Sequence, residues 1–290
     1  MKAVAFAPGH ISAFFEPVYI NQNFDRTGSR GAGINISLGA ISQAKLTYKS
    51  SQTIHVNING KPSDAPVTKL ALTHLLGTMP VSTQVDTQLD LPVSQGFGMS
   101  ACGALSATLA TADLLHLSRD TAVKAAHYAE VQLRTGLGDV VASSFGGIEI
   151  RREPGLPPWG ILQHIPGSYD LVVCVIGKRI ETREVLSDVR KLRKIEAAGQ
   201  MCMKKLLEKP SIESLFSLGL EFTQKTGLAS DRVLEAIEMA DRFGMASMCM
   251  LGNSIFALGD TPMIQKILAP YGKVWVCQVH ENGANIVEKQ

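Results

Sequence analysis

The sequence predicts an α+β protein built from two halves. In the first half, strand-like runs alternate with helical segments, and in the second half three helical segments follow one another between strand-like runs. A stretch rich in proline and glycine, residues 151–160, separates the halves. With 290 residues, 45% of them hydrophobic, the chain can bury a large core. We therefore expect one domain over residues 1–152 and a second over 153–290.

The first half contains two clear strand patterns and two helices. Gly33–Ser37 and Thr53–Ile58 alternate polar and apolar residues as strands do. A helix is predicted after Ser100, because small and apolar residues recur there at helical spacing on a face made of Ala101, Ala104, Leu105, Thr108, Leu109, Ala112 and Leu115. Ser118 is the N-cap candidate of a second helix.

The second half begins with an apolar strand over Tyr169–Ile176. Three helical segments are expected between residues 183 and 243. Strands are expected near Met248–Leu258 and Val274–Val279.

Charge and cysteine usage exclude several classes of protein. The chain has 28 basic and 26 acidic residues, a net charge of +2, and no long basic run, so nucleic acid and anionic membranes are not expected partners. No apolar stretch approaches about 18 residues, and the apolar run at the N-terminus is too short for a signal peptide, which favours the cytoplasm. The five cysteines form no Cys-x-x-Cys pair, so we expect buried free thiols.

The most informative segment is Leu91–Ala110, which places two glycines and a serine directly before a small-residue helix. Gly96 and Gly98 allow a positive φ and let the backbone approach a ligand closely. The next amides would be the unpaired first N–H groups of the helix, where phosphate binds well. The P-loop is excluded, because none of the three Gly-Lys pairs is followed by Ser or Thr. A dinucleotide fingerprint is disfavoured, because Ala101 occupies the place of its third glycine.

Residues Pro92–Ala104 resemble the second motif of the GHMP kinases, the superfamily of galactokinase, homoserine kinase and mevalonate kinase. Two further segments match, Pro8–Glu16 and Gly136–Gly147. Within the superfamily, the chain resembles the archaeal pantoate kinases over nearly its whole length, through Ala7–Phe15, Gly28–Asn35 and Arg134–Asp139. The region of the third GHMP motif, residues 246–257, keeps only Gly252 of its glycines, a departure that the pantoate kinases share.

The resemblance implies a fold and an activity. It implies a ribosomal-S5-like N-terminal domain and a ferredoxin-like C-terminal domain, with the active site between them. It also implies ATP and Mg²⁺ as cofactors and phosphorylation of (R)-pantoate to (R)-4-phosphopantoate, a step toward coenzyme A in archaea. The residues implied to bind ATP are Pro92, Gly96, Phe97, Gly98, Met99, Ser100, Ala101, Cys102 and Gly103.

Three residues are implied to carry the chemistry: Ser100 and Glu130 as Mg²⁺ ligands, and Asp139 as the catalytic base. Each has a simpler alternative. Ser100 could be a helix cap, and Asp139 could cap a helix that begins at Val140. Glu130 shares a helix face with His127 and Arg134, and such a face is often a solvated stripe of salt bridges.

Recognition of a carboxylate substrate needs cationic or donor-rich side chains, and Arg151 is the main candidate because guanidinium binds carboxylate through two hydrogen bonds. His127, Ser29, Arg30 and Thr182 are further candidates. As alternatives, Arg151 could be an exposed strand end, His127 a satisfied helix histidine and Thr182 a helix cap.

Two other functions stay open at this point. The chain could be a GHMP kinase for another small hydroxy acid or alcohol, such as homoserine or mevalonate. It could also be a non-catalytic nucleotide-binding regulator, although retention of Ser100, Glu130 and Asp139 argues against this. A homodimer is compatible with the sequence.

Overall fold

The structure, a computed structural model, describes residues 2–180, 185 and 187–289. Its larger sheet is mainly antiparallel, and among the described strands only β3 and β5 pair in parallel. Its main path has the order β12 (Asn285–Lys289), β1 (Lys2–Val18), β2 (Gly28–Tyr48), β5 (Val81–Leu89), β3 (Thr53–Ile58) and β4 (Lys61–Pro62). Two more strands extend the sheet beside the N-terminal part of β2. There, β6 (Ile148–Glu153) pairs with β2, and β7 (Ile161–Ile165) pairs with β6.

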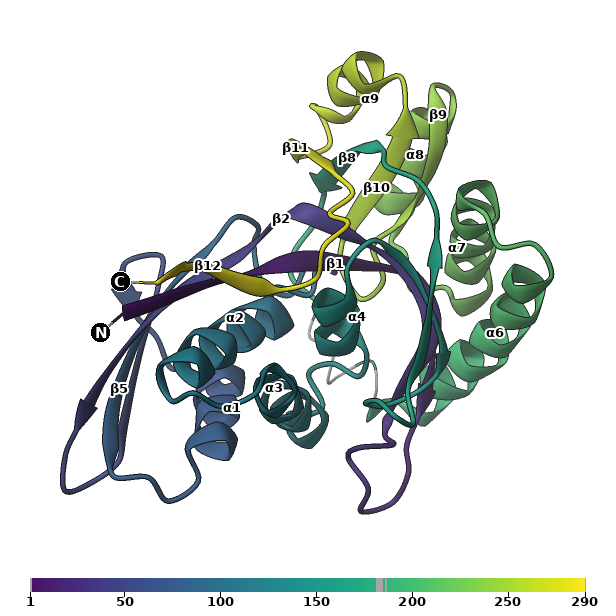
Figure 1. Cartoon of the computed structure of the whole chain (residues 1–290). Coiled ribbons are helices and arrows are strands. Elements are labelled where there is room, and N and C mark those ends of the chain that lie inside the picture. Colours follow the sequence, from purple (N-terminus) through teal and green to yellow (C-terminus); the bar gives the residue numbers. More distant parts are fainter. Residues whose placement is uncertain (1, 181–184, 186, 290) are drawn as a thin grey trace.

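Four helices lie on one face of this sheet: α1 (Pro66–Leu76), α2 (Met99–Leu114), α3 (Arg119–Leu133) and α4 (Asp139–Phe145). Helices α1, α2 and α4 contact its strands, and α3 packs against these three helices. Helix α2 is buried on almost every side, which its alanine and glycine side chains allow, because they let the sheet and the neighbouring helices approach closely. Helix α3 begins after Ser118, whose side chain accepts a hydrogen bond from the Thr121 amide, so the predicted cap is confirmed. Figure 1 shows α4 inside the curve of the large sheet, beside α2 and α3.

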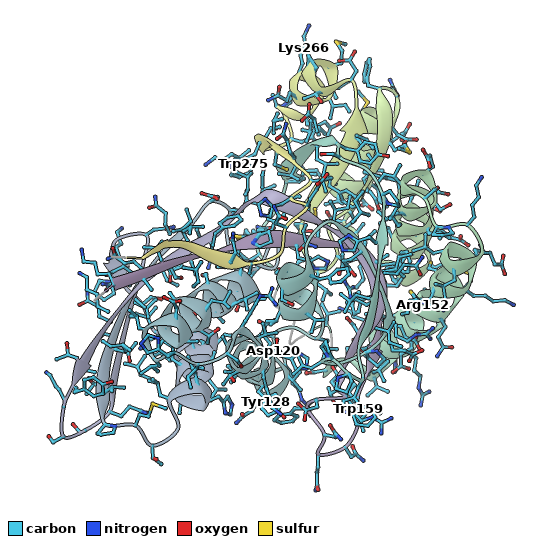
Figure 2. The ribbon with its side chains drawn as sticks, viewed as in Figure 1. Asp120, Tyr128, Arg152, Trp159, Lys266 and Trp275 are labelled. Atoms are coloured by element: carbon cyan, nitrogen blue, oxygen red, sulfur yellow. The ribbon has the colours of Figure 1, made fainter. Side chains whose placement is uncertain are left out.

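A second, four-stranded sheet lies beyond the other face, in the order β11 (Lys273–Gln278), β8 (Asp170–Val175), β10 (Ser254–Gly259) and β9 (Gly244–Met248). Helices α8 (Asp231–Asp241) and α9 (Thr261–Leu268) pack on it. Helices α6 (Val189–Glu208) and α7 (Ile212–Thr226) pack against each other and against β1. Helix α7 also packs against β9, so it joins the two sheets. In Figure 2, Lys266 and Trp275 mark the small-sheet part, well separated from Asp120 and Tyr128 on α3.

The structure confirms the predicted α+β class, and it also refines the organisation. Strands β7 and β12 follow residue 152 in the sequence, yet both belong to the large sheet. The large sheet therefore takes strands from both sides of the expected boundary at 152/153, and that boundary stays a prediction. The strands expected near Met248–Leu258 form a hairpin, since residues 249–253 turn and Leu251 has φ 62°.

One continuous apolar core joins both sheets and their helices. All five cysteines are buried and free, as expected from their spacing. Within the described part of the chain, no helix combines the length and the apolar character needed to cross a membrane.

Candidate active site

The segment with the two glycines forms a loop at the N-terminus of α2. Gly96 and Gly98 adopt φ values of 78° and 62°, which confirms the positive φ expected at both positions. Gly98 is the N-cap, so α2 begins at Met99, and Ser100 lies inside the first turn instead of capping it. The first amides of α2 have no partner within the helix and point out of its end, an arrangement that favours an anionic group there.

Two segments from far away in the sequence hold this loop. The His10 amide on β1 donates to the Phe97 carbonyl at 3.0 Å. On the other side, the Ser254 hydroxyl donates to the Gln95 carbonyl, and Gly252 packs so closely on Gln95 that a Cβ there would collide with its backbone. The one glycine kept from the third GHMP motif region is therefore at the place where the two loops touch.

A pocket opens where this loop, the end of α3 and the start of α4 meet. The pocket brings together the residues predicted to bind Mg²⁺ and to act as the base, Ser100, Glu130 and Asp139, although they come from three different helices. The lining consists of Ser12, Phe15, Ser29, Ser94, Gly96, Gly98, Met99, Ser100, Ala101, Glu130, Gly136, Leu137, Gly138, Asp139, Met250 and Leu251. Of the other residues expected to bind ATP, Gly103 lines a neighbouring hollow. Pro92, Phe97 and Cys102 line neither hollow, and Phe97 and Cys102 are buried behind the loop.

Asp139 is the first residue of α4, and its side chain is 29% exposed. Gly138 holds the N-cap position, so the simple alternative of Asp139 as the cap of a helix that begins at Val140 does not hold. Instead, His10 Nδ1 donates to Asp139 Oδ1 at 2.7 Å. Burial acts to raise the pKa of Asp139, but the hydrogen bond and charge of His10, with the charge of Arg151, hold that pKa below its ordinary value. The carboxylate is therefore ionised at neutral pH.

Glu130 behaves in the opposite way. Its side chain is buried on α3 rather than part of a solvated stripe, and Thr135 Oγ1 donates to its Oε1 at 3.1 Å. Burial, followed by the negative charge of Asp139, raises its pKa to about 8. Two carboxyl groups that face one pocket thus differ in their protonation at neutral pH.

The structure also brings in two residues to which the sequence assigned no role, His10 and Glu149. His10 Nε2 lies 2.8 Å from Glu149 Oε1, and Arg151 forms an ion pair with the same oxygen. Burial acts to lower the pKa of His10, but hydrogen bonds to Asp139 and Glu149 outweigh it and raise the pKa. His10, Glu149 and Arg151 are all buried, so this is a charged cluster behind the pocket wall.

The expected substrate residues fall into different places. Ser29 lines the pocket. Arg151 does not: its guanidinium pairs with Glu149 and donates from Nη2 to Ser12 Oγ at 3.1 Å. Arg30 pairs with Glu16 at 3.0 Å. Thr182 lies outside the described residues.

His127 is buried and outside the pocket lining. Its Nε2 lies 3.0 Å from the Phe24 carbonyl and 3.1 Å from the Thr27 carbonyl. This matches the alternative of a satisfied helix histidine. As direct substrate ligands, His127 and Arg151 stay predictions.

The residues expected to hold Mg²⁺ fit a hard cation in part. Ser100 and Glu130 offer hydroxyl and carboxylate oxygens on one pocket wall, and Glu130 is a buried carboxyl that a cation would stabilise in its ionised form. No group of three or more His, Cys, Asp or Glu able to hold a metal occurs among the described residues. Such a sparse protein set suits an ion that takes its other ligands from phosphates and water.

Comparison with known proteins agrees with this geometry. Residues 66–147, which include the loop, α2, α3 and Asp139, match the family model "GHMP kinases N terminal domain". Pantoate kinase of Thermococcus kodakarensis is 37% identical over 266 residues, which cover 88% of this chain and 86% of the relative. The chain belongs to the pantoate kinase family of the GHMP kinases.

A second curated relative and a solved structure match nearly the whole chain. The pantoate kinase of Methanospirillum hungatei is 33% identical, over 99% of this chain and 96% of the relative. A solved structure titled "Phosphotransferase related to CoA biosynthesis pathway" superposes with a TM-score of 0.89 at 30% identity and covers 99% of both chains. Membership of this kinase family implies that the chain uses ATP.

The raised pKa of Glu130 predicts a pH-dependent stability in metal-free protein. The folded pKa of about 8 exceeds the unfolded value of 4.5, so Glu130 keeps its proton up to a higher pH in the folded state than in the unfolded state. The stability that Glu130 contributes is complete below the unfolded pKa and is lost as pH rises through the folded one. Relative to Glu130→Gln, the free energy of unfolding of the wild type should therefore fall by more than about 1 kcal/mol between about pH 5 and pH 8.

Urea unfolding of both proteins at the two pH values measures this difference. Glu208→Gln, a change of an exposed glutamate at the end of α6, is the matched control and should show no such slope. An equal slope for wild type and Glu130→Gln would mean that Glu130 is ionised throughout.

Proposed function

We propose that this chain transfers the γ-phosphoryl group of ATP to the primary hydroxyl of (R)-pantoate, giving (R)-4-phosphopantoate and ADP in archaeal coenzyme A synthesis. The observation that carries the proposal is that the Asp139 carboxylate and the N-terminus of α2 face one pocket. The relatives named pantoate kinase support the choice of acceptor.

The phosphates of ATP are proposed to lie at the N-terminus of α2. There, the unpaired amides and the positive end of the helix dipole stabilise negative charge, and the two glycines let the phosphates approach the backbone. The nucleoside would occupy the neighbouring hollow, which shares Ser94, Met99 and Ser100 with the pocket and has apolar walls that include Pro62 and Val67. Each part of ATP thus has a surface of suitable chemistry.

Asp139 is proposed to orient the acceptor hydroxyl and to take its proton. In the transfer, a bond forms between the hydroxyl oxygen and the γ-phosphorus while the bond from phosphorus to the ADP oxygen breaks. Phosphoryl transfer passes through a loose transition state, so the hydroxyl proton leaves late and an ionised carboxylate of low pKa is strong enough to accept it. Positioning and charge stabilisation then supply most of the rate.

Ser100 and Glu130 are proposed to hold Mg²⁺ together with the ATP phosphates. When bound, Mg²⁺ neutralises phosphate charge during the transfer. It would also favour the ionised form of Glu130, whose proton otherwise stays on up to a pH of about 8.

Among the candidates for binding the substrate, Ser29 is the one that the pocket geometry supports best, because it lines the pocket near Asp139. Arg151 lies directly behind this part of the wall: a Cβ at Gly138 would meet Arg151 Nε at 2.8 Å and would clash with Ser29 Oγ. His127 and Thr182 are further proposed contacts. The cytoplasmic location and the homodimer likewise stay predictions.

A test of acceptors decides the function. Purified protein with ATP and Mg²⁺ should release ADP with (R)-pantoate, and not with homoserine, mevalonate, galactose or shikimate at equal concentration. Release with another acceptor instead would keep the kinase activity and contradict the substrate. ATP binding by calorimetry without release on any acceptor would favour a regulator.

The role of Asp139 has its own test. Asp139→Asn keeps the size of the side chain and removes its charge, so kcat should fall at least about 100-fold while the affinity for ATP, measured by calorimetry, changes less than about threefold. Asp120→Asn, an exposed change on α3, is the matched control and should leave both values unchanged. Normal turnover of Asp139→Asn would exclude Asp139 as the base.

A further inference from the structure

The charged cluster behind the pocket joins side chains of two strands that are not neighbours. His10 and Ser12 lie on β1, Glu149 and Arg151 lie on β6, and β2 runs between them. Neighbouring strands are about 4.8 Å apart, so side chains on β1 and β6 would ordinarily be separated by the side chains of β2. Here they touch, with His10 Nε2 at 2.8 Å from Glu149 Oε1 and Arg151 Nη2 at 3.1 Å from Ser12 Oγ.

Glycines on β2 make this contact across the strand feasible. Gly33 pairs with Ser12 on one side and with Glu149 on the other, and Gly31 pairs with Arg151. A Cβ at Gly33 would collide with His10 Nε2 and would lie 3.0 Å from Glu149 Oε1. A Cβ at Gly31 would lie 2.9 Å from Arg151 Nη2. Any side chain at Gly33 would therefore occupy the space through which His10 reaches Glu149.

The hydrogen bonds determine the protonation of His10. Both of its ring nitrogens face carboxylate oxygens, Nδ1 that of Asp139 at 2.7 Å and Nε2 that of Glu149 at 2.8 Å. Carboxylates only accept, so the ring donates from both nitrogens and is an imidazolium. Arg151 Nη1 is also 3.2 Å from Nε2, but its nearer acceptor is Glu149 Oε1. The charged groups that face His10 are thus Asp139 from α4 and Glu149 and Arg151 from β6.

We propose that Glu149 is a positioning residue, which keeps His10 doubly protonated and oriented so that its Nδ1–H holds the Asp139 carboxylate toward the pocket. Glu149 is fully buried and does not line the pocket, so it acts through His10. Arg151 neutralises Glu149 and orients it, and with its second nitrogen it fixes Ser12 in the pocket wall. The inference rests on the proposed function, because it assigns Asp139 to the phosphoryl transfer.

Glu149→Gln tests this directly. The amide oxygen can replace Oε1 toward His10 and Arg151, and the amide nitrogen takes the place of Oε2. Since Oε2 lacks a partner among the described residues, the change removes the charge and keeps the shape. We expect kcat at about pH 8 to fall about tenfold, with KM for ATP and for pantoate changed less than about threefold.

The pH profile separates positioning from a purely structural effect. Without the Glu149 charge, His10 loses its proton at a lower pH, so the fall of kcat with rising pH should begin at least about one unit lower than in wild type. Glu153→Gln, an exposed glutamate at the end of the same strand, is the matched control and should keep the wild-type profile. A Glu149→Gln enzyme with wild-type kcat and pH profile would overturn the proposal.

A measurement on the wild-type protein keeps the test decisive if the variant does not fold. Nitrogen-15 NMR of the histidine rings, with His10 assigned through His10→Gln, should show both ring nitrogens of His10 protonated at about pH 7. A neutral His10 ring at that pH would contradict the proposal. Because this spectrum needs no substrate, it separates failure of the positioning role from failure of the proposed function, which the acceptor assay reports.

Discussion

The geometry of the pocket depends on one residue, His10, which contacts both the loop before α2 and the start of α4. The His10 amide donates to the Phe97 carbonyl and so fixes the loop that opens α2. The His10 ring donates to Asp139 and so fixes the start of α4. The phosphate-binding end of α2 and the acceptor carboxylate are therefore positioned from the same point on β1. Because a phosphoryl transfer requires donor and acceptor in line, a fixed separation between these two sides matters more than the strength of any single contact.

The charges of the pocket are divided between two carboxyl groups by their surroundings. Asp139 has a cationic partner, so it remains an ionised acceptor with a lowered pKa. Glu130 has none among the described residues, and burial, followed by the charge of Asp139, raises its pKa to about 8. In the proposed function, a metal ion held with the phosphates supplies the missing positive charge beside Glu130. In this proposal the ionised Asp139 orients the acceptor hydroxyl, whereas Glu130 binds the cation.

The sequence predicted the parts of this site that are local in the chain. Gly96 and Gly98 before a small-residue helix indicated the phosphate loop, and the structure gives both the expected positive φ. The resemblance pointed to Ser100, Glu130 and Asp139, which the structure brings into one pocket. Local pattern alone favoured a cap for Ser100 and a solvated stripe for Glu130. The first interpretation fails because Gly98 caps α2, and the second fails because tertiary packing buries the side chain of Glu130.

The cluster around His10 was not predicted, because it depends on strand register. The chain does contain a signal, in the form of three pairs of residues spaced by two: His10 and Ser12, Gly31 and Gly33, Glu149 and Arg151. Residues spaced by two share a face of a strand. However, only the pairing of β1 with β2 and of β2 with β6 places the glycine pair between the two polar pairs. The same cause explains why Arg151 is buried, which excludes the alternative of an exposed strand end.

The most direct test of the account is a crystal structure of the protein with (R)-pantoate, Mg²⁺ and a non-hydrolysable ATP analogue. The account predicts that the analogue's phosphates contact the first amides of α2, and that the primary hydroxyl of pantoate lies about 3 Å from an Asp139 oxygen that still accepts a hydrogen bond from His10. Phosphates bound away from α2, or a pantoate hydroxyl turned away from Asp139, would contradict it.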